Sequence, residues 1–372
     1  MTGCQVMVKP ASSRCNLRCR YCFYIEKPQQ NVMDDDTLEA FIRQHIDAQP
    51  GDEVLFAWQG GEPTLCGLDY FKRVAALQQR YANGKRIANA FQTNGILLND
   101  AWCQFFREHN WLVGISIDGP APLHDALRVS NSGKPTHHKV VDAIHLLTAH
   151  RVEFNLLVVV NSLNSQHPQA LYRYLRTLGT PFIQFIPLVE RDENGNLTAE
   201  SLTGQRWGEF LTRVFSVWVR EDIGRVYVQL FDSTLGVWCG YPSQMCAQSE
   251  RCGHAFALES NGDLYQCDHY VYPAYRLGNI HEQPLKVLNA QPEVAAFGAN
   301  KQRSLTDACR QCPVLRLCQG DCPKHRLSAG KSALCAGYRH FFTDTAPHMK
   351  IMRDLLKHHR SPVELMVMLL RS

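Results

Sequence analysis

The sequence has no long apolar run and no basic block, and these absences exclude several classes of protein. No stretch approaches the roughly 18 consecutive apolar residues that a membrane-spanning helix requires. The N-terminal residues MTGCQVMVKPA lack the charged and apolar parts of a secretory signal. The net charge of +4 is small for 372 residues, so the composition gives no support for nucleic-acid binding. We therefore expect a cytoplasmic protein with no membrane segment.

Charged residues make up only 20% of the chain, whereas apolar residues make up 45%, so a sizeable core is expected and disorder is not. A chain of 372 residues fits one large domain and a smaller one. The 15 cysteines are many for a cytoplasmic protein, in which disulfides are rare. They therefore indicate metal or redox chemistry.

Residues 1 to about 190 repeat one pattern, in which a short apolar run is followed by a turn and an amphipathic stretch. The apolar runs are rich in Val, Ile, Leu and Phe, as expected of strands that are buried on both faces. The predicted strands cover residues 4–8, 53–58, 86–91, 112–117, 153–160 and 182–186.

Amphipathic helices are predicted between these strands, including segments at 34–48 and 68–81. In the first segment, Leu38, Phe41 and Ile42 fall on one face behind an Asp cap. Strands that alternate with helices in this way are parallel and joined by right-handed crossovers. The predicted fold class is therefore α/β, a partial (β/α)6 barrel followed by a small cysteine-rich domain. A doubly wound open sheet is the alternative.

The unusual residues cluster directly after the strands. Three cysteines follow the first strand, QGGEP (59–63) follows the second and QTNG (92–95) follows the third. SIDG (116–119) ends the fourth strand, and PLVER (187–191) follows the sixth. In a βα barrel these positions share one rim, where active sites form. The sequence therefore predicts a single site built from the loops of several repeats.

From about residue 230 the helical periodicity fades, and eight cysteines appear between Cys246 and Cys335. Such a segment is typical of a small, loop-rich domain that bound metal holds together. The predicted divisions are a first domain over 1–230, a cysteine-rich domain over 231–345 and a helical tail over 346–372.

Cys15, Cys19 and Cys22 have the spacing C-x3-C-x2-C, and no histidine lies nearby in the sequence to complete a tetrahedral metal site. A [4Fe–4S] cluster held by three thiolates has one iron open to a further ligand, as a catalytic zinc has one open position. The triplet therefore predicts a cluster at which a small molecule binds.

The eight later cysteines supply two complete four-cysteine sites, which would stabilise the fold or carry electrons. Spacing alone favours iron–sulfur clusters over zinc only slightly, and the N-terminal triplet strengthens that preference. Cys322 is followed by proline, as is the ferredoxin cysteine that ligates the other cluster. By this analogy the predicted sets are Cys246, Cys252, Cys267 and Cys322, and Cys309, Cys312, Cys318 and Cys335. An exchange of Cys322 and Cys335 is the alternative.

The motif CNLRCRYC resembles the cluster-binding motif of radical S-adenosylmethionine (SAM) enzymes, and GGEP resembles the motif with which they contact the SAM amino group. The later cysteines resemble the SPASM extension, which carries two auxiliary [4Fe–4S] clusters. Within that group the chain resembles the anaerobic sulfatase-maturating enzymes up to about residue 345. The resemblance implies a radical SAM-type fold with a SPASM domain, three [4Fe–4S] clusters, and SAM.

The activity that the resemblance implies is an oxidation without molecular oxygen. The reduced N-terminal cluster cleaves SAM to methionine and a 5′-deoxyadenosyl radical, which removes a Cβ hydrogen from a Ser or Cys of an unfolded sulfatase segment. A base takes the hydroxyl or thiol proton, an auxiliary cluster accepts the remaining electron, and the product is Cα-formylglycine. The implied partners are the sulfatase polypeptide and an electron donor such as flavodoxin or ferredoxin.

The resemblance assigns the base to Asp268, directly after Cys267, where deprotonation and electron departure can be coupled. It assigns SAM binding to Tyr21, Gly60, Ser116, Arg128 and Val189. Two other functions stay open. One is maturation of another ribosomal peptide through a thioether or other crosslink, and the other is that of a non-catalytic zinc or electron-transfer protein.

Overall fold

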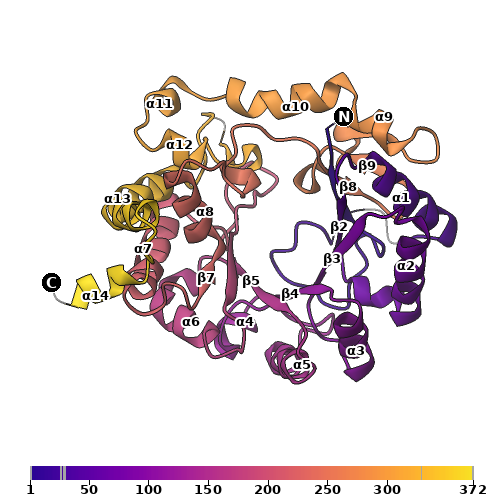
Figure 1. Cartoon of the computed structure of the whole chain (residues 1–372), viewed down its shortest axis with the longest axis horizontal. Helices are drawn as coiled ribbons and strands as arrows, with labels where there is room; N and C mark the ends of the chain where they lie inside the picture. The colour runs from indigo at the N-terminus through magenta and orange to yellow at the C-terminus, as the bar shows by residue number, and fades with distance from the viewer. Residues whose placement is uncertain (1, 26, 28–30, 328, 371–372) are drawn as a thin grey trace. The chain divides into compact units, whose positions relative to one another are not determined.

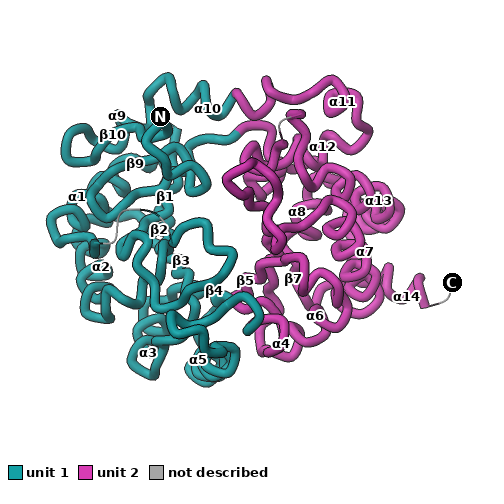
Figure 2. Tube along the Cα trace, turned by 180° about the vertical axis from the view of Figure 1, so that it is seen from behind, with its two compact units in different colours: residues 1–116, 125–154, 252–299 teal, residues 117–124, 155–251, 300–372 magenta. Residues whose placement is uncertain are grey.

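The computed structural model describes residues 2–25, 27, 31–327 and 329–370, which fall into two compact units. Figure 2 shows unit 1 (1–116, 125–154 and 252–299) and unit 2 (117–124, 155–251 and 300–372) in different colours. Both units are discontinuous in sequence. The domain limits at residues 230 and 345 therefore stay predictions from the sequence.

Unit 1 is built on a sheet with the strand order β10-β9-β8-β1-β2-β3-β4. Its strands are β1 (Gln5–Val8), β2 (Glu53–Trp58), β3 (Arg86–Thr93), β4 (Leu112–Ser116), β8 (Ala255–Leu258), β9 (Asp263–Tyr265) and β10 (Arg276–Asn279). Strands β2, β3, β4, β8 and β9 are labelled in Figure 1. Neighbouring strands from β8 through β1 to β4 are parallel, and β8, β9 and β10 form antiparallel pairs. The predicted N-terminal strands are thus present, and β8 adds a parallel neighbour to β1.

The helices of unit 1 connect these strands or follow them. They are α1 (Asp35–Ala48), α2 (Leu68–Tyr81), α3 (Asp100–Glu108), α5 (His137–Ala149) and α9 (Leu285–Asn289), with short 3-10 turns η1 (Pro63–Cys66), η4 (Asp268–Tyr270) and η5 (Pro273–Tyr275). Helix α10 (Pro292–Arg303) begins in unit 1 and ends in unit 2. Asp34 caps α1 as predicted, because its side chain accepts a hydrogen bond from the Thr37 amide at 2.8 Å. Leu38, Phe41 and Ile42 are fully buried, which confirms the apolar face.

Unit 2 contains parallel strands in the order β5-β6-β7 and the two longest helices, α7 and α13. The strands are β5 (Phe154–Val160), β6 (Phe182–Pro187) and β7 (Tyr227–Val228). The helices and 3-10 turns are α4 (Ala121–His124), η2 (Asn164–Gln166), α6 (Pro168–Leu175), α7 (Gly204–Glu221), α8 (Gln229–Trp238), η3 (Cys246–Gln248), α11 (Asp307–Arg310), α12 (Leu315–Cys318), η6 (Pro323–His325), α13 (Cys335–Lys357) and α14 (Glu364–Leu370). No helix in the described ranges is long and apolar enough to span a membrane.

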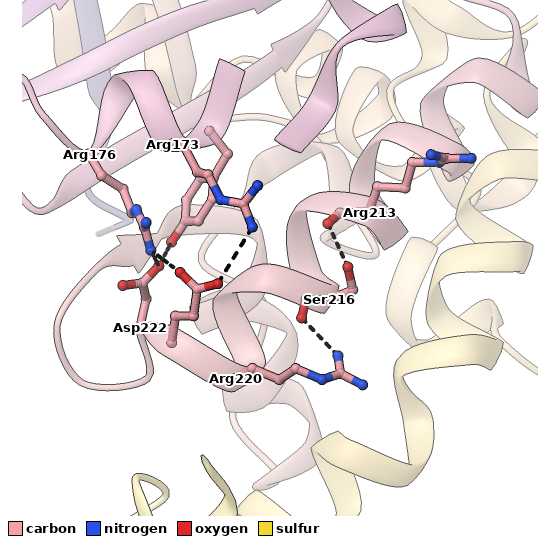
Figure 3. Close-up of polar contacts among 8 residues, drawn as sticks. Arg173, Arg176, Arg213, Ser216, Arg220 and Asp222 are labelled. Carbon is pink, nitrogen blue, oxygen red and sulfur yellow. Dashed lines mark hydrogen bonds and ion pairs between the residues drawn. The ribbon is translucent and has the colours of Figure 1, made fainter. Parts of the chain in front are cut away.

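Polar contacts join α6 to the end of α7, as Figure 3 shows. Asp222 is buried and accepts hydrogen bonds from the Tyr172 hydroxyl at 2.7 Å and from Arg176 at 2.6 Å. Within α7, Arg220 donates to the Ser216 carbonyl at 2.8 Å. A buried carboxylate with two donors is well compensated, so this joint fixes α6 against α7.

The expectation that helical structure fades after residue 230 was wrong. Helix α13 has 23 residues, begins at Cys335 and buries Tyr338, Phe341 and Met349. These positions fall on one helical face. The prediction was based on the eight cysteines of this part of the sequence and not on its apolar pattern. Helix α13 also continues through the predicted domain limit at residue 345.

Helices α7 and α13 pack with their backbones in close approach, because both carry glycine at the crossing. A Cβ added to Gly337 would lie 2.1 Å from the carbonyl oxygen of Gly204 and 2.7 Å from the amide nitrogen of Gly208. Real atoms do not approach so closely, and here the obstacle is backbone rather than a flexible side chain. Glycine at position 337 is therefore required by packing.

We expect Gly337→Ala to lower the free energy of unfolding by about 3 kcal/mol, at the upper end of overpacking costs. The measurement is the urea midpoint of the anaerobic holoprotein. Gly236→Ala in α8 is the matched control, since a Cβ there meets nothing within 4 Å. The control should be neutral or slightly stabilising, because alanine favours a helix. Equal midpoints for the two variants would contradict the packing argument.

Candidate functional site

The loop after β1 carries Cys15, Cys19 and Cys22 and is held by backbone hydrogen bonds within unit 1. The amide of Arg18 donates to the carbonyl of Val129 at 2.9 Å, and the amide of Arg20 donates to the carbonyl of Leu127 at 2.9 Å. Arg128 is thereby placed beside the cysteine loop, although more than a hundred residues separate the two segments.

The GGEP loop after β2 lies directly against the cysteine loop. The amide of Gly61 donates to the carbonyl of Ser12 at 2.6 Å, and the amide of Glu62 donates to the carbonyl of Arg14 at 2.9 Å. A Cβ at Gly61 would lie 2.1 Å from the Arg14 carbonyl oxygen. Gly60 has φ +132°, which L side chains rarely adopt. Both glycines are therefore dictated by this close approach.

Glu62 joins the second loop to the third. Its side chain is 1% exposed and accepts hydrogen bonds from the Thr64 amide and hydroxyl at 3.0 and 2.7 Å, the Thr93 hydroxyl at 2.8 Å and the Asn94 amide at 2.7 Å. Burial raises the pKa of Glu62, and these hydrogen bonds act in the opposite direction. The predicted convergence of the loops after β1, β2 and β3 is thus observed within unit 1.

The three N-terminal thiols lie close enough to influence one another. Burial raises the pKa of the Cys15 thiol to about 12, and Cys19 and Cys22 act in the same direction. The Cys15 sulfur also accepts hydrogen bonds from the Leu17 amide at 3.4 Å and from the Asn94 side chain at 3.8 Å. Grouped thiols with hydrogen-bond donors aimed at a sulfur fit an iron–sulfur cluster, whose electron affinity such bonds tune.

Four of the residues predicted to bind SAM are in unit 1. Arg128 donates to the Tyr21 hydroxyl at 2.7 Å, so these two lie together beside the cysteine loop. Gly60 is in the GGEP loop and Ser116 ends β4. Val189 is buried and follows β6 in unit 2, so its place in the same site stays a prediction.

Asp268 begins η4 and forms an ion pair with Lys9, which the sequence reasoning did not identify. The Lys9 side chain is 3% exposed and the Asp268 side chain 16% exposed. The Lys9 ammonium also lies 4.2 Å from the centroid of the Tyr24 ring, at cation–π distance. An ion pair that is largely removed from water holds its two groups in fixed positions.

A buried glutamate completes this cluster. Glu259 is 3% exposed, accepts a hydrogen bond from the Tyr24 hydroxyl, and accepts another from the Ser12 hydroxyl at 2.6 Å. Burial raises the pKa of Glu259, while Ser12 and Lys9 lower it. The strand pairing explains the cluster, because β1 and β8 are parallel and in register and Lys9 and Glu259 directly follow them. Asp268 therefore belongs to a polar cluster at the carboxyl ends of β1 and β8.

The second predicted four-cysteine set lies wholly in unit 2. Burial raises the pKa of Cys318 to about 11, and Cys312 and Cys335 act in the same direction. The pKa of Cys335 is raised by burial and by Cys309 and Cys312. Each of the four thiols is therefore within electrostatic reach of others in the set, which fits a closed four-cysteine site.

The first set is distributed over both units. Cys252 and Cys267 belong to unit 1, and Cys246 and Cys322 belong to unit 2, so their grouping stays a prediction. Within unit 1 the Cys252 amide donates to the Gly298 carbonyl at 3.2 Å. Within unit 2 the buried Lys301 donates to the Cys246 carbonyl at 2.9 Å.

Comparisons with known proteins identify the family of this chain. The model of the radical SAM superfamily matches residues 10–175, and that of the SPASM iron–sulfur cluster-binding domain matches residues 246–313. The serine-type anaerobic sulfatase-maturating enzyme of Bacteroides thetaiotaomicron is 42% identical, and the alignment covers 97% of this chain and 94% of that protein. This chain belongs to the anaerobic sulfatase-maturating enzyme family.

Other members of the anaerobic sulfatase-maturating enzyme family are similar over almost their full length. The cysteine-type enzyme of Clostridium perfringens is 35% identical over 94% of this chain and 98% of its own. The structure of native anSMEcpe with bound AdoMet and Cp18Cys peptide has a TM-score of 0.87 at 32% identity, covering 95% of this chain and 99% of that one. The radical SAM-type α/β fold with a SPASM domain is thereby confirmed, as are SAM and iron–sulfur clusters as cofactors. The zinc-protein hypothesis is rejected.

Proposed function

We propose that this chain oxidises a Ser or Cys of a sulfatase polypeptide to Cα-formylglycine without molecular oxygen. Family membership supports this reaction. The main structural support is the Asp268–Lys9 ion pair, which lies at the end of the same sheet that the three-cysteine loop follows. The C-terminal edge of a parallel sheet is where α/β enzymes place their chemistry. The ion pair with Lys9 holds the Asp268 carboxylate beside the carboxyl end of β1, which supports this proposal.

When bound, the N-terminal cluster supplies the electron that cleaves SAM to methionine and a 5′-deoxyadenosyl radical. Cys15, Cys19 and Cys22 would hold that cluster, and the GGEP loop, tied down by Glu62, would present backbone groups to SAM. Arg128 and Tyr21 form a hydrogen-bonded pair that offers donors to the SAM carboxylate or ribose. Ser116, Gly60 and Val189 complete the proposed SAM contacts.

Asp268 is the proposed base. Its carboxylate would accept the hydroxyl or thiol proton of the target residue as the Cβ radical gives up one electron to an auxiliary cluster site. Lys9 holds the carboxylate in place from the side of β1, the Tyr24 ring lies against the Lys9 ammonium, and Glu259 accepts a hydrogen bond from the Tyr24 hydroxyl. A base must be positioned within hydrogen-bond reach of the proton that it removes, and this network provides that positioning.

Serine is the proposed preferred target. The serine-type enzymes from Bacteroides and Klebsiella are 42% and 41% identical to this chain, whereas the cysteine-type enzymes from Clostridium are 31% to 35% identical. We further expect the enzyme to act in the cytoplasm, where the polypeptide is still unfolded, and to receive electrons from a flavodoxin or ferredoxin.

Anaerobic turnover of paired peptides tests this function. Iron-reconstituted protein would receive SAM, dithionite and a peptide with S-x-P-x-R or its C-x-P-x-R counterpart. We expect 5′-deoxyadenosine and a hydrazine-trappable aldehyde to appear in step, with the serine peptide turned over faster. Deoxyadenosine without aldehyde from either peptide would favour a maturase of another ribosomal peptide instead.

A further inference from the structure

The small net charge of the chain conceals a basic segment. Residues 300–357 contain eleven Lys or Arg and four Asp or Glu, a net charge of +7, whereas the whole chain carries +4. The rest of the chain is therefore slightly acidic. This segment includes all four cysteines of the second auxiliary set, so positive charge is concentrated around one predicted redox site.

Two of these basic side chains, Lys331 and Arg339, are exposed and lie near Cys335, whereas Lys301 and Arg326 are buried. Lys331 and Arg339 line an open groove of about 730 Å³ together with Cys335 and His340. Cys335 and Arg339 are four residues apart in α13 and so share a face of that helix.

A second group of cations surrounds Trp238 in the same unit. The guanidinium groups of Arg316 and Arg353 lie 4.2 and 5.8 Å from the centre of the indole ring, and the ammonium group of Lys350 lies 5.9 Å from it. Arg316 is two residues from Cys318. Three cations so close to one ring repel one another, and the binding of a negatively charged partner would offset this repulsion.

We propose that this basic face, defined by Arg316, Lys331, Arg339 and Lys350, docks an acidic electron-carrier protein of the flavodoxin or ferredoxin class. Redox proteins exchange electrons at short range, so such a partner binds where a cluster is near the surface. Cys335, a predicted ligand of the second auxiliary cluster, is only half-buried, so this cluster would lie near the surface. Complementary charge increases the rate of encounter and selects the partner. The proposal rests on the proposed function in one respect only, that the second auxiliary set holds an iron–sulfur cluster.

Calorimetric titration of the anaerobic holoenzyme with a purified flavodoxin of strongly negative net charge tests the proposal. Lys331→Glu/Arg339→Glu should weaken binding at least about tenfold at 50 mM salt, because two favourable charge pairs become repulsive. The difference should shrink at 500 mM salt, where screening is strong. The matched control is Arg107→Glu/Arg225→Glu, which reverses the charge of two exposed arginines outside the segment and should bind like wild type.

Further variants keep the result interpretable. Iron content and dithionite-driven deoxyadenosine formation report whether each variant retains its clusters. If Lys331→Glu/Arg339→Glu loses iron, Arg316→Glu/Lys350→Glu and the neutral Lys331→Gln/Arg339→Gln take its place, with losses of affinity expected in the same direction. Equal affinities for the variants and the control, or binding that does not depend on salt, would overturn the proposal.

The other outcomes separate this proposal from the proposed function. If the same variants weaken binding of the sulfatase peptide and leave flavodoxin binding unchanged, the face binds substrate and the docking proposal is wrong. If wild type binds flavodoxin in the expected way and forms no aldehyde from either peptide, the proposed substrate fails while the docking face stands.

Discussion

Replacing Asp268 with asparagine is expected to lower aldehyde formation at least about 100-fold, the lower end of what a positioned general base contributes. Deoxyadenosine formation should stay within about threefold of wild type, because the proton is removed after SAM has been cleaved. Asparagine keeps the shape of the side chain and removes its capacity to take a proton. The measurement is the ratio of aldehyde to deoxyadenosine in single anaerobic reactions.

Two further variants separate a chemical from a structural effect. Asp263→Asn is the matched control. Asp263 lies on β9, shortly before Asp268 in the sequence, and its carboxylate is also ion-paired, in this case with Arg276. It should leave the product ratio unchanged. Lys9→Met should lower the ratio by a smaller factor, and Lys9→Arg should restore part of it by keeping the positive charge. A parallel fall of both products in Asp268→Asn would remove Asp268 from its role as the base.

Cys15→Ala is expected to abolish SAM cleavage, with deoxyadenosine falling at least about 1000-fold. Two thiolates do not hold a [4Fe–4S] cluster firmly, so the variant should lose one of three clusters and fall from about twelve irons to about eight. The same result is expected for Cys19→Ala and Cys22→Ala. Iron analysis and deoxyadenosine formation on the same sample give both numbers.

Cys66→Ala serves as the control for the loss of a thiol. Cys66 ends η1, directly after the GGEP loop, and it is outside all three predicted ligand sets. It should keep its full iron content and its SAM cleavage. If Cys15→Ala keeps twelve irons and cleaves SAM, the N-terminal triplet does not ligate the cluster.

The motif-bearing loops could be predicted because their chemistry is local in sequence. The C-x3-C-x2-C triplet and GGEP each follow a strong strand signal, and the carboxyl ends of parallel strands share an edge. The structure brings these loops together through hydrogen bonds of Gly61 and Glu62 to the cysteine loop. Asp268 was found only through the family resemblance.

The network around Asp268 could not be predicted from the residues alone. It depends on the parallel register of β1 with β8, two strands that are about 250 residues apart in the sequence. Lys9 follows β1 and Glu259 follows β8, and nothing in the sequence indicates that these two residues will be neighbours. Long-range pairing of this kind is set by the packing of the whole sheet.

The C-terminal part was mispredicted for a related reason. Between Cys246 and Cys335 the cysteine spacing is the most prominent feature of the sequence. Short turns that carry these cysteines interrupt the apolar periodicity by which helices are recognised. Helix α13 nevertheless begins at a cysteine and continues for 23 residues. Its packing on α7 depends on Gly204, Gly208 and Gly337, and close approach between two helices leaves no periodic signal in either one.

The central claim is that a SAM-derived radical removes a Cβ hydrogen from a sulfatase residue in this enzyme. A serine peptide deuterated at Cβ tests it most directly, with mass spectrometry of both products. The account predicts that deoxyadenosine gains one deuterium and that the aldehyde retains the other. Deoxyadenosine without deuterium, formed together with aldehyde, would contradict the account, because the hydrogen would then come from elsewhere.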